Sequence, residues 1–295
     1  MSFHPMSALR GRRLVALTIV VLIAATHTAA LATEGTVPAA DGALIHFTDQ
    51  GQGDPVLVFV HGWSCDAGYW DAQVESFKAH NRVVAIDLAG HGASGRERTD
   101  YTMEAFGGDV AAVLRKLDLK GALLIGHSMG GAVIVEAALA APDRVAGLIG
   151  VDNFQDVNLK LPPQAVDGFV GTFEANFVPG VTAWVSRMFP AGADSALAAG
   201  IAADMASAPP EVGLSALRNY LTWIGDHTTA RLAELTVPLM CVSAEQPPTQ
   251  VEAIKAIVPG FQLRVLPGRG HFLMREDPAG FNKLLAETVG AFAKP

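Results

Sequence analysis

A serine at position 128 lies in a setting that suits covalent chemistry. It is the middle residue of the segment 126–130, which reads Gly-His-Ser-Met-Gly, and the apolar run 122–125 before it predicts a buried strand. A small, apolar helix is predicted directly after it, over residues 130–140. A tight strand-to-helix turn holds such a hydroxyl clear of the backbone at a helix N-terminus, where the helix dipole favours developing negative charge. We therefore predict that Ser128 is a nucleophile.

A histidine near the end of the chain is the expected partner, because a serine hydroxyl is a poor nucleophile until a base removes its proton. His271 follows the last predicted strand, residues 262–265, and Gly268 and Gly270 allow the intervening loop to approach the serine closely. His127 lies inside the tight turn, where we expect its backbone to matter more than its ring. We therefore predict that His271 is the general base.

Acyl transfer also requires hydrogen-bond donors for the oxyanion of the tetrahedral intermediate. The backbone N–H of Met129, the residue after the serine, is one expected donor. The second is expected from the turn after a strand at residues 56–60, which reads His-Gly-Trp. Gly62 permits the sharp bend there, so the N–H of Trp63 is the other predicted donor of the oxyanion hole.

Short apolar strands alternate with longer helical patterns along the chain, which is typical of a mainly parallel sheet flanked by helices. We predict further strands at residues 82–86, 145–151 and 238–242, an antiparallel edge strand at 42–48, and a helix at 101–117. Residues 154–229 contain no strand pattern, only helical pieces separated by prolines. This stretch is predicted to form a helical cap over the carboxyl edge of the sheet, where sites in open α/β folds lie.

Four motifs in this order resemble the α/β-hydrolase superfamily. They are the turn at 61–63, the segment 87–92 (Asp-Leu-Ala-Gly-His-Gly), the serine segment extended to Gly131, and Gly-His-Phe at 270–272. The resemblance implies a single α/β domain at 33–295, with a mainly parallel eight-stranded sheet, flanking helices and an inserted helical cap at about 154–229. It also implies a Ser-His-acid triad and an acyl-enzyme, but it leaves the substrate open because this fold serves many chemistries.

The acidic member of the triad is where the sequence departs from the superfamily pattern. Many relatives carry this acid a few residues after the strand equivalent to 238–242, where this chain has Pro247. Two substitutes remain: Asp152, at the end of the strand 145–151, in a place that some relatives use, and Glu245, close to the usual site. Either carboxylate can fix the imidazole tautomer and stabilise the imidazolium. We favour Asp152 and retain Glu245 as the alternative.

The expected activity is hydrolysis of a carboxylic ester, or a lactone, of a small to medium apolar substrate. The aromatic candidates for the substrate pocket are Trp63, Phe154, Trp223 and Phe272. No metal or organic cofactor is implied, and a serine nucleophile argues against dehalogenase and epoxide-hydrolase chemistry, which uses a carboxylate in similar proteins. The alternatives are perhydrolysis or cleavage of a carbon–carbon bond with the same triad, and a ligand-sensing protein of slow turnover.

The composition is that of a globular domain preceded by an export segment. Of the 295 residues 50% are hydrophobic, and the formal net charge of −8 argues against nucleic acid as a partner. Arg10, Arg12 and Arg13 precede the apolar run 14–25, and residues 30–32 (Ala-Leu-Ala) fit a cleavage site. We therefore predict a signal peptide at 1–32 and an exported mature chain, periplasmic or secreted, without a membrane span. An uncleaved anchor is the alternative.

Overall fold

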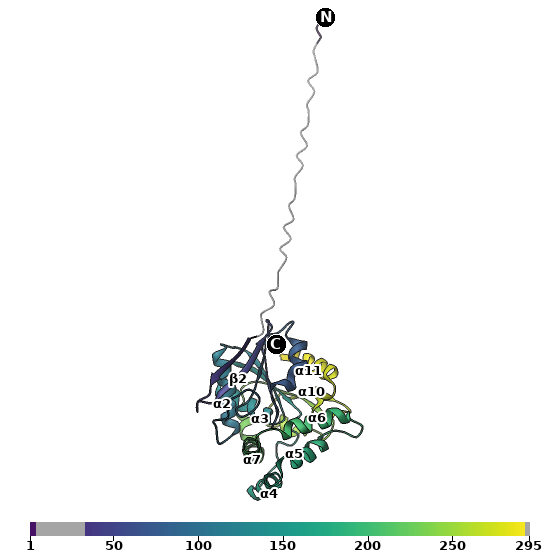
Figure 1. Cartoon of the computed structure of the whole chain (residues 1–295). Helices are drawn as coiled ribbons and strands as arrows, with labels where there is room; N and C mark the ends of the chain where they lie inside the picture. The colour runs from purple at the N-terminus through teal and green to yellow at the C-terminus, as the bar shows by residue number, and fades with distance from the viewer. Residues whose placement is uncertain (4–32, 293–295) are drawn as a thin grey trace.

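The computed structural model describes residues 1–3 and 33–292, which contain one eight-stranded sheet (Figure 1). The strands are β1 (Thr33–Pro38), β2 (Leu44–Gln50), β3 (Leu57–Val60), β4 (Val83–Ile86), β5 (Ala122–His127), β6 (Val145–Val151), β7 (Leu239–Ala244) and β8 (Gln262–Leu266). Their order in the sheet is β1-β2-β4-β3-β5-β6-β7-β8. β2 pairs antiparallel with β1 and with β4, and all other neighbours are parallel. The predicted mainly parallel eight-stranded sheet with flanking helices is therefore confirmed.

The prediction that residues 42–48 form an edge strand of the sheet is wrong. The strand expected at the edge, at residues 42–48, corresponds to β2. The strand β1 pairs with the outer side of β2, with Thr33 opposite Asp49 at one end and Pro38 opposite Leu44 at the other. Most side chains of β1 are exposed, so this strand lacks the alternation of apolar residues that marks a half-buried strand.

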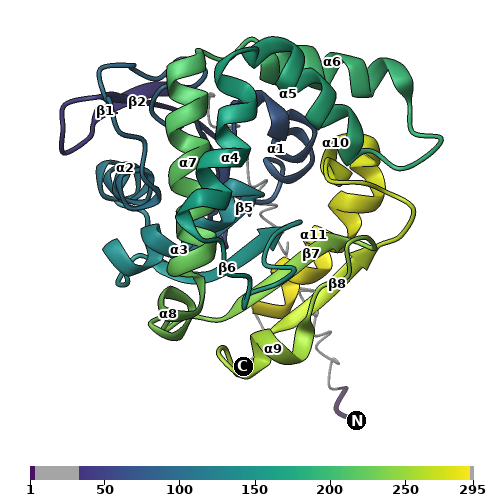
Figure 2. The ribbon, with the colours of Figure 1, turned by 90° about the horizontal axis from the view of Figure 1, so that it is seen from below.

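Helices cover both faces of the sheet (Figure 2). α2 (Met103–Lys116) and α3 (Met129–Ala140) pack together on one face, and α1 (Asp71–Phe77) and α11 (Pro278–Phe292) pack on the other. The shorter helices outside the β6–β7 connection are η1 (Ala67–Trp70), α9 (Val251–Lys255) and α10 (Leu273–Glu276). β3, β4 and β5 are buried along their whole length, as expected of parallel strands between two helical layers.

The connection between β6 and β7 is helical. It contains α4 (Pro163–Glu174), α5 (Phe177–Val185), η2 (Ser186–Met188), α6 (Ser195–Ala206), α7 (Pro210–Asp226) and α8 (Thr228–Ala233). α4, α5 and α7 gather at one end of the molecule, and α7 contacts both α2 and α3 (Figure 1). On α4 the buried residues Val166, Val170 and Phe173 recur at helical spacing, so one apolar stripe fixes this helix on its neighbours.

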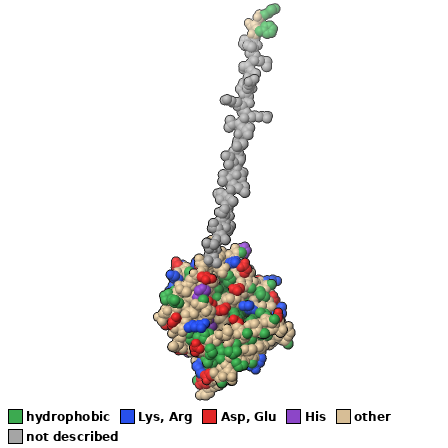
Figure 3. Space-filling view, viewed as in Figure 1, with side chains coloured by type: hydrophobic (Ala, Val, Ile, Leu, Met, Phe, Trp, Pro, Cys, Tyr) green, Lys and Arg blue, Asp and Glu red, His purple; other side chains and the backbone are tan. Residues whose placement is uncertain are grey.

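The face drawn in Figure 3 mixes acidic, basic and apolar side chains, and its Lys and Arg side chains are scattered singly. Among the helices of residues 1–3 and 33–292, none has the length and apolar character needed to traverse a bilayer. The predicted signal peptide, residues 1–32, falls almost wholly on residues 4–32, which lie outside the described residues.

The carboxyl ends of the parallel strands bring the predicted site residues to one edge of the sheet. Trp63 follows β3, Ser128 follows β5, and Asp152 follows β6. Glu245 follows β7, and His271 follows β8. Because these strands are neighbours and run in the same direction, residues far apart in the chain reach the same region.

Candidate active site

Ser128 occupies a strained turn between β5 and α3. Its φ of 52° and ψ of −118° are rarely adopted by residues other than glycine, and its N–H donates to the carbonyl of Val151 at 2.9 Å. Glycine is required at positions 126 and 130 because neither position has room for a side chain. A Cβ at Gly126 would overlap the backbone of Gly130, and a Cβ at Gly130 would lie 2.6 Å from the carbonyl oxygen of His61. The close approach of these segments fixes the backbone that carries the Ser128 hydroxyl.

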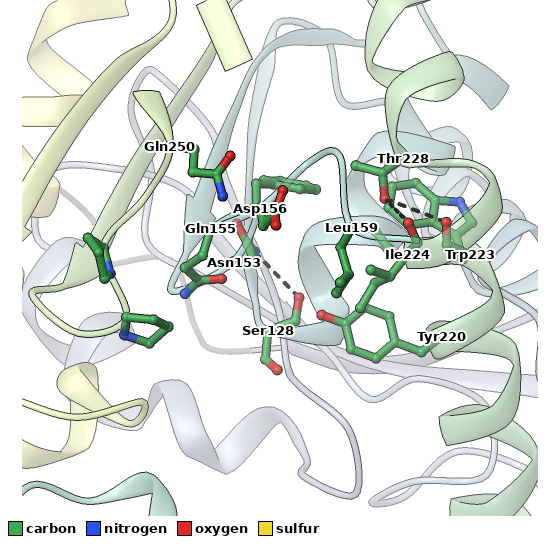
Figure 4. Close-up of a pocket in the computed structure, with 14 residues that line it drawn as sticks. Ser128, Asn153, Gln155, Asp156, Leu159, Tyr220, Trp223, Ile224, Thr228 and Gln250 are labelled. Carbon is green, nitrogen blue, oxygen red and sulfur yellow. Dashed lines mark hydrogen bonds between the residues drawn. The ribbon is translucent and has the colours of Figure 1, made fainter. Parts of the chain in front are cut away.

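The buried side-chain amide of Asn153, which the sequence analysis did not identify, stabilises this turn. Asn153 Nδ2 donates to the carbonyl of Gly126 at 2.9 Å and to that of Ser128 at 3.4 Å, the second of which is drawn in Figure 4. A Cβ at Gly131 would collide with the same amide, so the start of α3 and Asn153 fit each other. No local pattern marks Asn153 in the sequence, because both of its partners lie at the end of a different strand.

His271 lies in the loop between β8 and α10, and the backbone on both sides of it is fixed. Its N–H donates to the carbonyl of Met188 at 3.0 Å, and the N–H of Gly270 donates to the carboxylate of Glu276 at 3.0 Å. Ser128 and His271 line the same cavity of about 20 Å³. In the part of the chain that the structure describes, no hydrogen bond joins their side chains.

The two candidate acids have different surroundings. Asp152 is 3% exposed, and its Oδ2 lies 2.6 Å from His271 Nδ1. Its Oδ1 accepts the N–H of Ala244 at 2.9 Å, and its own N–H donates to the carbonyl of Val242 at 3.0 Å, so β7 holds the carboxylate in one orientation. Glu245 is exposed, and no hydrogen bond or ion pair of the described residues involves its carboxylate. The structure therefore places Asp152, and not Glu245, against the imidazole of His271.

The ring of His127 also contacts the site, a contact that the sequence analysis did not anticipate. Its Nε2 lies 2.9 Å from the carbonyl oxygen of His271 and must donate, because a carbonyl only accepts. The two imidazole rings are 4.7 Å apart between centroids. Burial lowers the pKa of His127 well below its usual value, so the ring is neutral. This contact spans 144 positions of the chain, which is why local sequence reasoning overlooked it.

The predicted oxyanion donors lie at the ends of β3 and β5. Within the described residues, no hydrogen bond uses the backbone N–H of Trp63 or of Met129. Met129 is the first residue of α3, and the N–H groups of a first helical turn have no partner inside the helix. The turn after β3 lies against the serine, since a Cβ at Gly62 would be 3.3 Å from the Cβ of Ser128. The indole N–H of Trp63 donates to the carbonyl of Gly213 at 2.7 Å, which ties this turn to α7.

Two cavities of unequal size meet at Ser128. The larger, about 490 Å³, is bounded by the chain after β6, by α7 and by the loop after β7 (Figure 4). Phe154 and Trp223 line the larger cavity, and Trp63 and Phe272 line the smaller one. The structure thus brings all four predicted pocket residues to the site but divides them between the two cavities. In residues 1–3 and 33–292, no group of three or more His, Cys, Asp or Glu side chains is placed to hold a metal ion.

A tyrosine that the sequence analysis did not single out, Tyr220, also lines the larger cavity. It lies three residues before Trp223 on α7, and Figure 4 shows its hydroxyl pointing toward Ser128. Residues three or four apart share one face of a helix, so the helical spacing from Trp223 was a usable signal for it.

A buried glutamate on α3 anchors the wall of the larger cavity. Glu136 Oε1 accepts the indole N–H of Trp223 at 2.7 Å and lies 3.1 Å from Nε of Arg231. Burial raises the pKa of Glu136, although the Trp223 hydrogen bond and Arg231 oppose the shift. Because Trp223 lies on α7 and Arg231 on α8, this cluster joins the inserted helices to the helix that begins at the serine turn.

If the chain hydrolyses an apolar ester, as the sequence analysis expects, replacing Glu136 with alanine should raise KM for that ester about tenfold, with a smaller effect on kcat. The Trp223 indole N–H would lose its buried acceptor, which costs roughly 1–3 kcal/mol, and the indole would shift in the cavity wall. Glu136→Gln keeps an acceptor oxygen and should keep KM close to that of the unmodified protein. Steady-state kinetics of both variants test this, and equal KM changes in the two would contradict the role given to the acceptor.

A sequence profile described as the Alpha/beta hydrolase family matches residues 57–284. Among curated proteins, the chain is 40% identical over 152 residues to a non-heme chloroperoxidase of Streptomyces lividans, a match covering 48% of this chain and 55% of the relative. It is 43% identical over 99 residues to a bifunctional esterase/perhydrolase of Acinetobacter calcoaceticus, covering 33% of this chain and 36% of the relative. The chain therefore spans about half, or less, of the length of these curated relatives.

Two solved structures with 25% sequence identity match almost the entire fold. An N-acyl homoserine lactone degrading enzyme, Est816, superposes with a TM-score of 0.73 over 86% of this chain and 99% of its own. A thermophilic esterase from Thermogutta terrifontis superposes with a TM-score of 0.74 over 90% of this chain and 100% of its own.

Proposed function

Because the chain belongs to the alpha/beta hydrolase family, we propose that it cleaves a carboxylic ester, or a lactone, of a small to medium apolar substrate through an acyl-enzyme on Ser128. The observation that carries the proposal is the 2.6 Å hydrogen bond between His271 and Asp152, beside the cavity that Ser128 also lines. A buried carboxylate at Nδ1 holds the imidazole in the tautomer whose Nε2 accepts a proton. The similarity to an esterase and to a lactone-degrading enzyme supports the same class of substrate.

The acylation half of the reaction follows from the order of these groups. Ser128 Oγ attacks the carbonyl carbon while its proton passes to Nε2 of His271, and Asp152 stabilises the resulting imidazolium without taking the proton. The carbonyl oxygen becomes an oxyanion and accepts hydrogen bonds from the backbone N–H groups of Trp63 and Met129. When the intermediate collapses, the bond to the leaving oxygen breaks and His271 returns its proton to that oxygen.

The deacylation half repeats these steps with water in place of serine. His271 removes a proton from a water molecule that attacks the acyl carbon, and the same two N–H groups hold the second oxyanion. The bond to Ser128 Oγ then breaks, Oγ regains its proton from His271, and the carboxylic acid leaves. Each cycle consumes one ester and one water and restores the triad.

A fluorophosphonate probe tests the proposal directly, because it phosphonylates a serine only where a base activates the hydroxyl. We expect the probe to label the purified protein at Ser128, as mapped by peptide mass spectrometry, and to abolish turnover of p-nitrophenyl esters. Labelling of Ser128 together with only slow turnover of esters would instead match the ligand-sensing alternative, and absence of labelling would contradict Ser128 as the nucleophile.

Perhydrolysis is a second candidate activity, favoured by the similarity to a chloroperoxidase and to a bifunctional esterase/perhydrolase. In this reaction hydrogen peroxide, instead of water, attacks the acyl-enzyme and releases a peracid, which oxidises a halide ion. Halide oxidation that requires hydrogen peroxide and a carboxylic acid, and that disappears in the Ser128→Ala variant, would support it. Oxidation that persists in that variant would exclude the acyl-enzyme route.

Export remains a prediction of the sequence, and we propose that the chain is periplasmic or secreted after cleavage near Ala32. Cleavage near Ala32 would keep all eight described strands in the mature chain, including β1 and its pairing with β2. N-terminal sequencing of the protein from fractionated cells is expected to start near Thr33, and a membrane-bound chain that retains its first residues would favour the uncleaved anchor.

A further inference from the structure

Two hydrogen bonds attach the inward face of α7 to the core, one before Tyr220 along the helix and one after it. Near the start of the helix, the carbonyl of Gly213 accepts the indole N–H of Trp63 at 2.7 Å. Near its end, the indole N–H of Trp223 donates to Glu136 of α3 at 2.7 Å. The positions of Gly213, Leu217, Tyr220 and Trp223 follow helical spacing, so they share one face of α7. Tyr220 is therefore presented to the site by a helix that is pinned on both sides of it.

The hydroxyl of Tyr220 is a polar group in a largely apolar part of the cavity wall. Its neighbours there include Leu159, Trp223 and Ile224, and Figure 4 shows the hydroxyl directed at Ser128. Burial raises the pKa of the Tyr220 phenol, while pairing with the Ser128 side chain opposes the shift. The phenol therefore keeps its proton at neutral pH and can donate it in a hydrogen bond.

The unequal cavities indicate which part of an ester lies beside Tyr220. The cavity of about 20 Å³, enclosed by Trp63, Trp184, Met188 and Phe272 among others, has room only for a small group. That volume suits only a short acyl chain, such as the methyl group of an acetyl ester. The cavity of about 490 Å³ then receives the alcohol portion, whose bridging oxygen does need a donor when the bond to it breaks.

We propose that Tyr220 is a catalytic residue that donates a hydrogen bond to the leaving-group oxygen of the ester, an inference that rests on the proposed esterase function. As the tetrahedral intermediate collapses, the carbon–oxygen bond breaks and its electron pair moves to the leaving oxygen. That oxygen takes the proton held by His271, and Tyr220 stabilises the developing charge while retaining its own proton. The helical connection between β6 and β7 thus supplies a hydrogen-bond donor for the reaction and also forms part of the pocket wall.

The test is the response of a Tyr220→Phe variant to a series of acetate esters whose alcohols differ in acidity. For p-nitrophenyl acetate the leaving oxygen needs little help, and kcat/KM should change by no more than about threefold. For ethyl acetate, whose alkoxide is strongly basic, kcat/KM should fall on the order of tenfold to a hundredfold. The ratio of the two rates in one sample is independent of how much of the variant is folded, so a loss of stability cannot imitate the result.

Tyr101→Phe is the matched control, because Tyr101 is a buried tyrosine outside both cavities whose hydroxyl donates to the carbonyl of Arg96. It should show no dependence on the leaving group. An equal loss for all esters in Tyr220→Phe, or no loss, would overturn the role of Tyr220 while labelling of Ser128 by a fluorophosphonate leaves the esterase proposal intact. Absence of both labelling and ester turnover in the unmodified protein would overturn both.

Discussion

Replacement of Ser128 with alanine is expected to lower kcat/KM for every ester by on the order of 10⁵-fold, because the attacking oxygen is removed and the triad acts as a unit. The substitution deletes one atom, and alanine occupies the backbone conformation at φ 52° no less readily than serine. The variant should therefore fold like the unmodified protein, with the same circular dichroism spectrum and a similar Tm. It should also lose all labelling by a fluorophosphonate.

A second buried serine provides the control for this experiment. Ser243 lies on β7, and its hydroxyl has no hydrogen-bond partner among the residues that the structure describes. Ser243→Ala should keep ester hydrolysis near the level of the unmodified protein. If Ser128→Ala kept most of its activity, the nucleophile would have to be another residue and the proposed mechanism would fail.

Substitution of Asp152 with asparagine is expected to lower kcat about 10³- to 10⁴-fold with little change in KM. Asparagine has the shape of aspartate, tolerates the positive φ of 49° found at this position, and keeps an oxygen for the N–H of Ala244. What it loses is the charge that stabilises the imidazolium of His271 and fixes its tautomer. The loss should therefore appear in the chemical step and not in folding or substrate binding.

Glu245→Gln is the matched variant, because it makes the same chemical change at the competing carboxylate. Glu245 is exposed, so its neutralisation should leave kcat and KM nearly unchanged. Kinetics of the two variants with one p-nitrophenyl ester settle the question. A large loss of kcat in Glu245→Gln with none in Asp152→Asn would assign Glu245 as the triad acid instead. Full activity in both variants would show that neither carboxylate is needed for catalysis.

The strands β2 to β8, in their order along the chain, and the serine turn could be predicted because their signals are local. An apolar run, a Gly-His-Ser-Met-Gly segment and a helical pattern follow one another in the sequence, and the same residues form β5, the turn and α3. The position of β2 inside the sheet could not be predicted, because the pairing partner that removes it from the edge, β1, has mostly exposed side chains.

The contacts among site residues depend on which strands become neighbours. The contact between Asp152 and His271 joins positions 119 residues apart, and it exists because β7 pairs with both β6 and β8 in the sheet. The sequence alone offered two carboxylates at neighbouring strand ends and no means of telling which one turns inward. The pairing of the end of β6 with that of β7 turns Asp152 toward the imidazole, while Glu245 remains in solvent.

The fold class, the serine turn and the histidine, tryptophan and carboxylate candidates could all be recognised from the sequence, because each is encoded in short segments with their own patterns. Three features became visible only in the folded chain: the contact of Asp152 with His271, the hydrogen bond from the ring of His127 to His271, and the direction of Tyr220 toward Ser128. These contacts are made between elements distant in the chain. Their geometry depends on the register of the strands and on the packing of α7 against the core. No single segment of the sequence determines either of these.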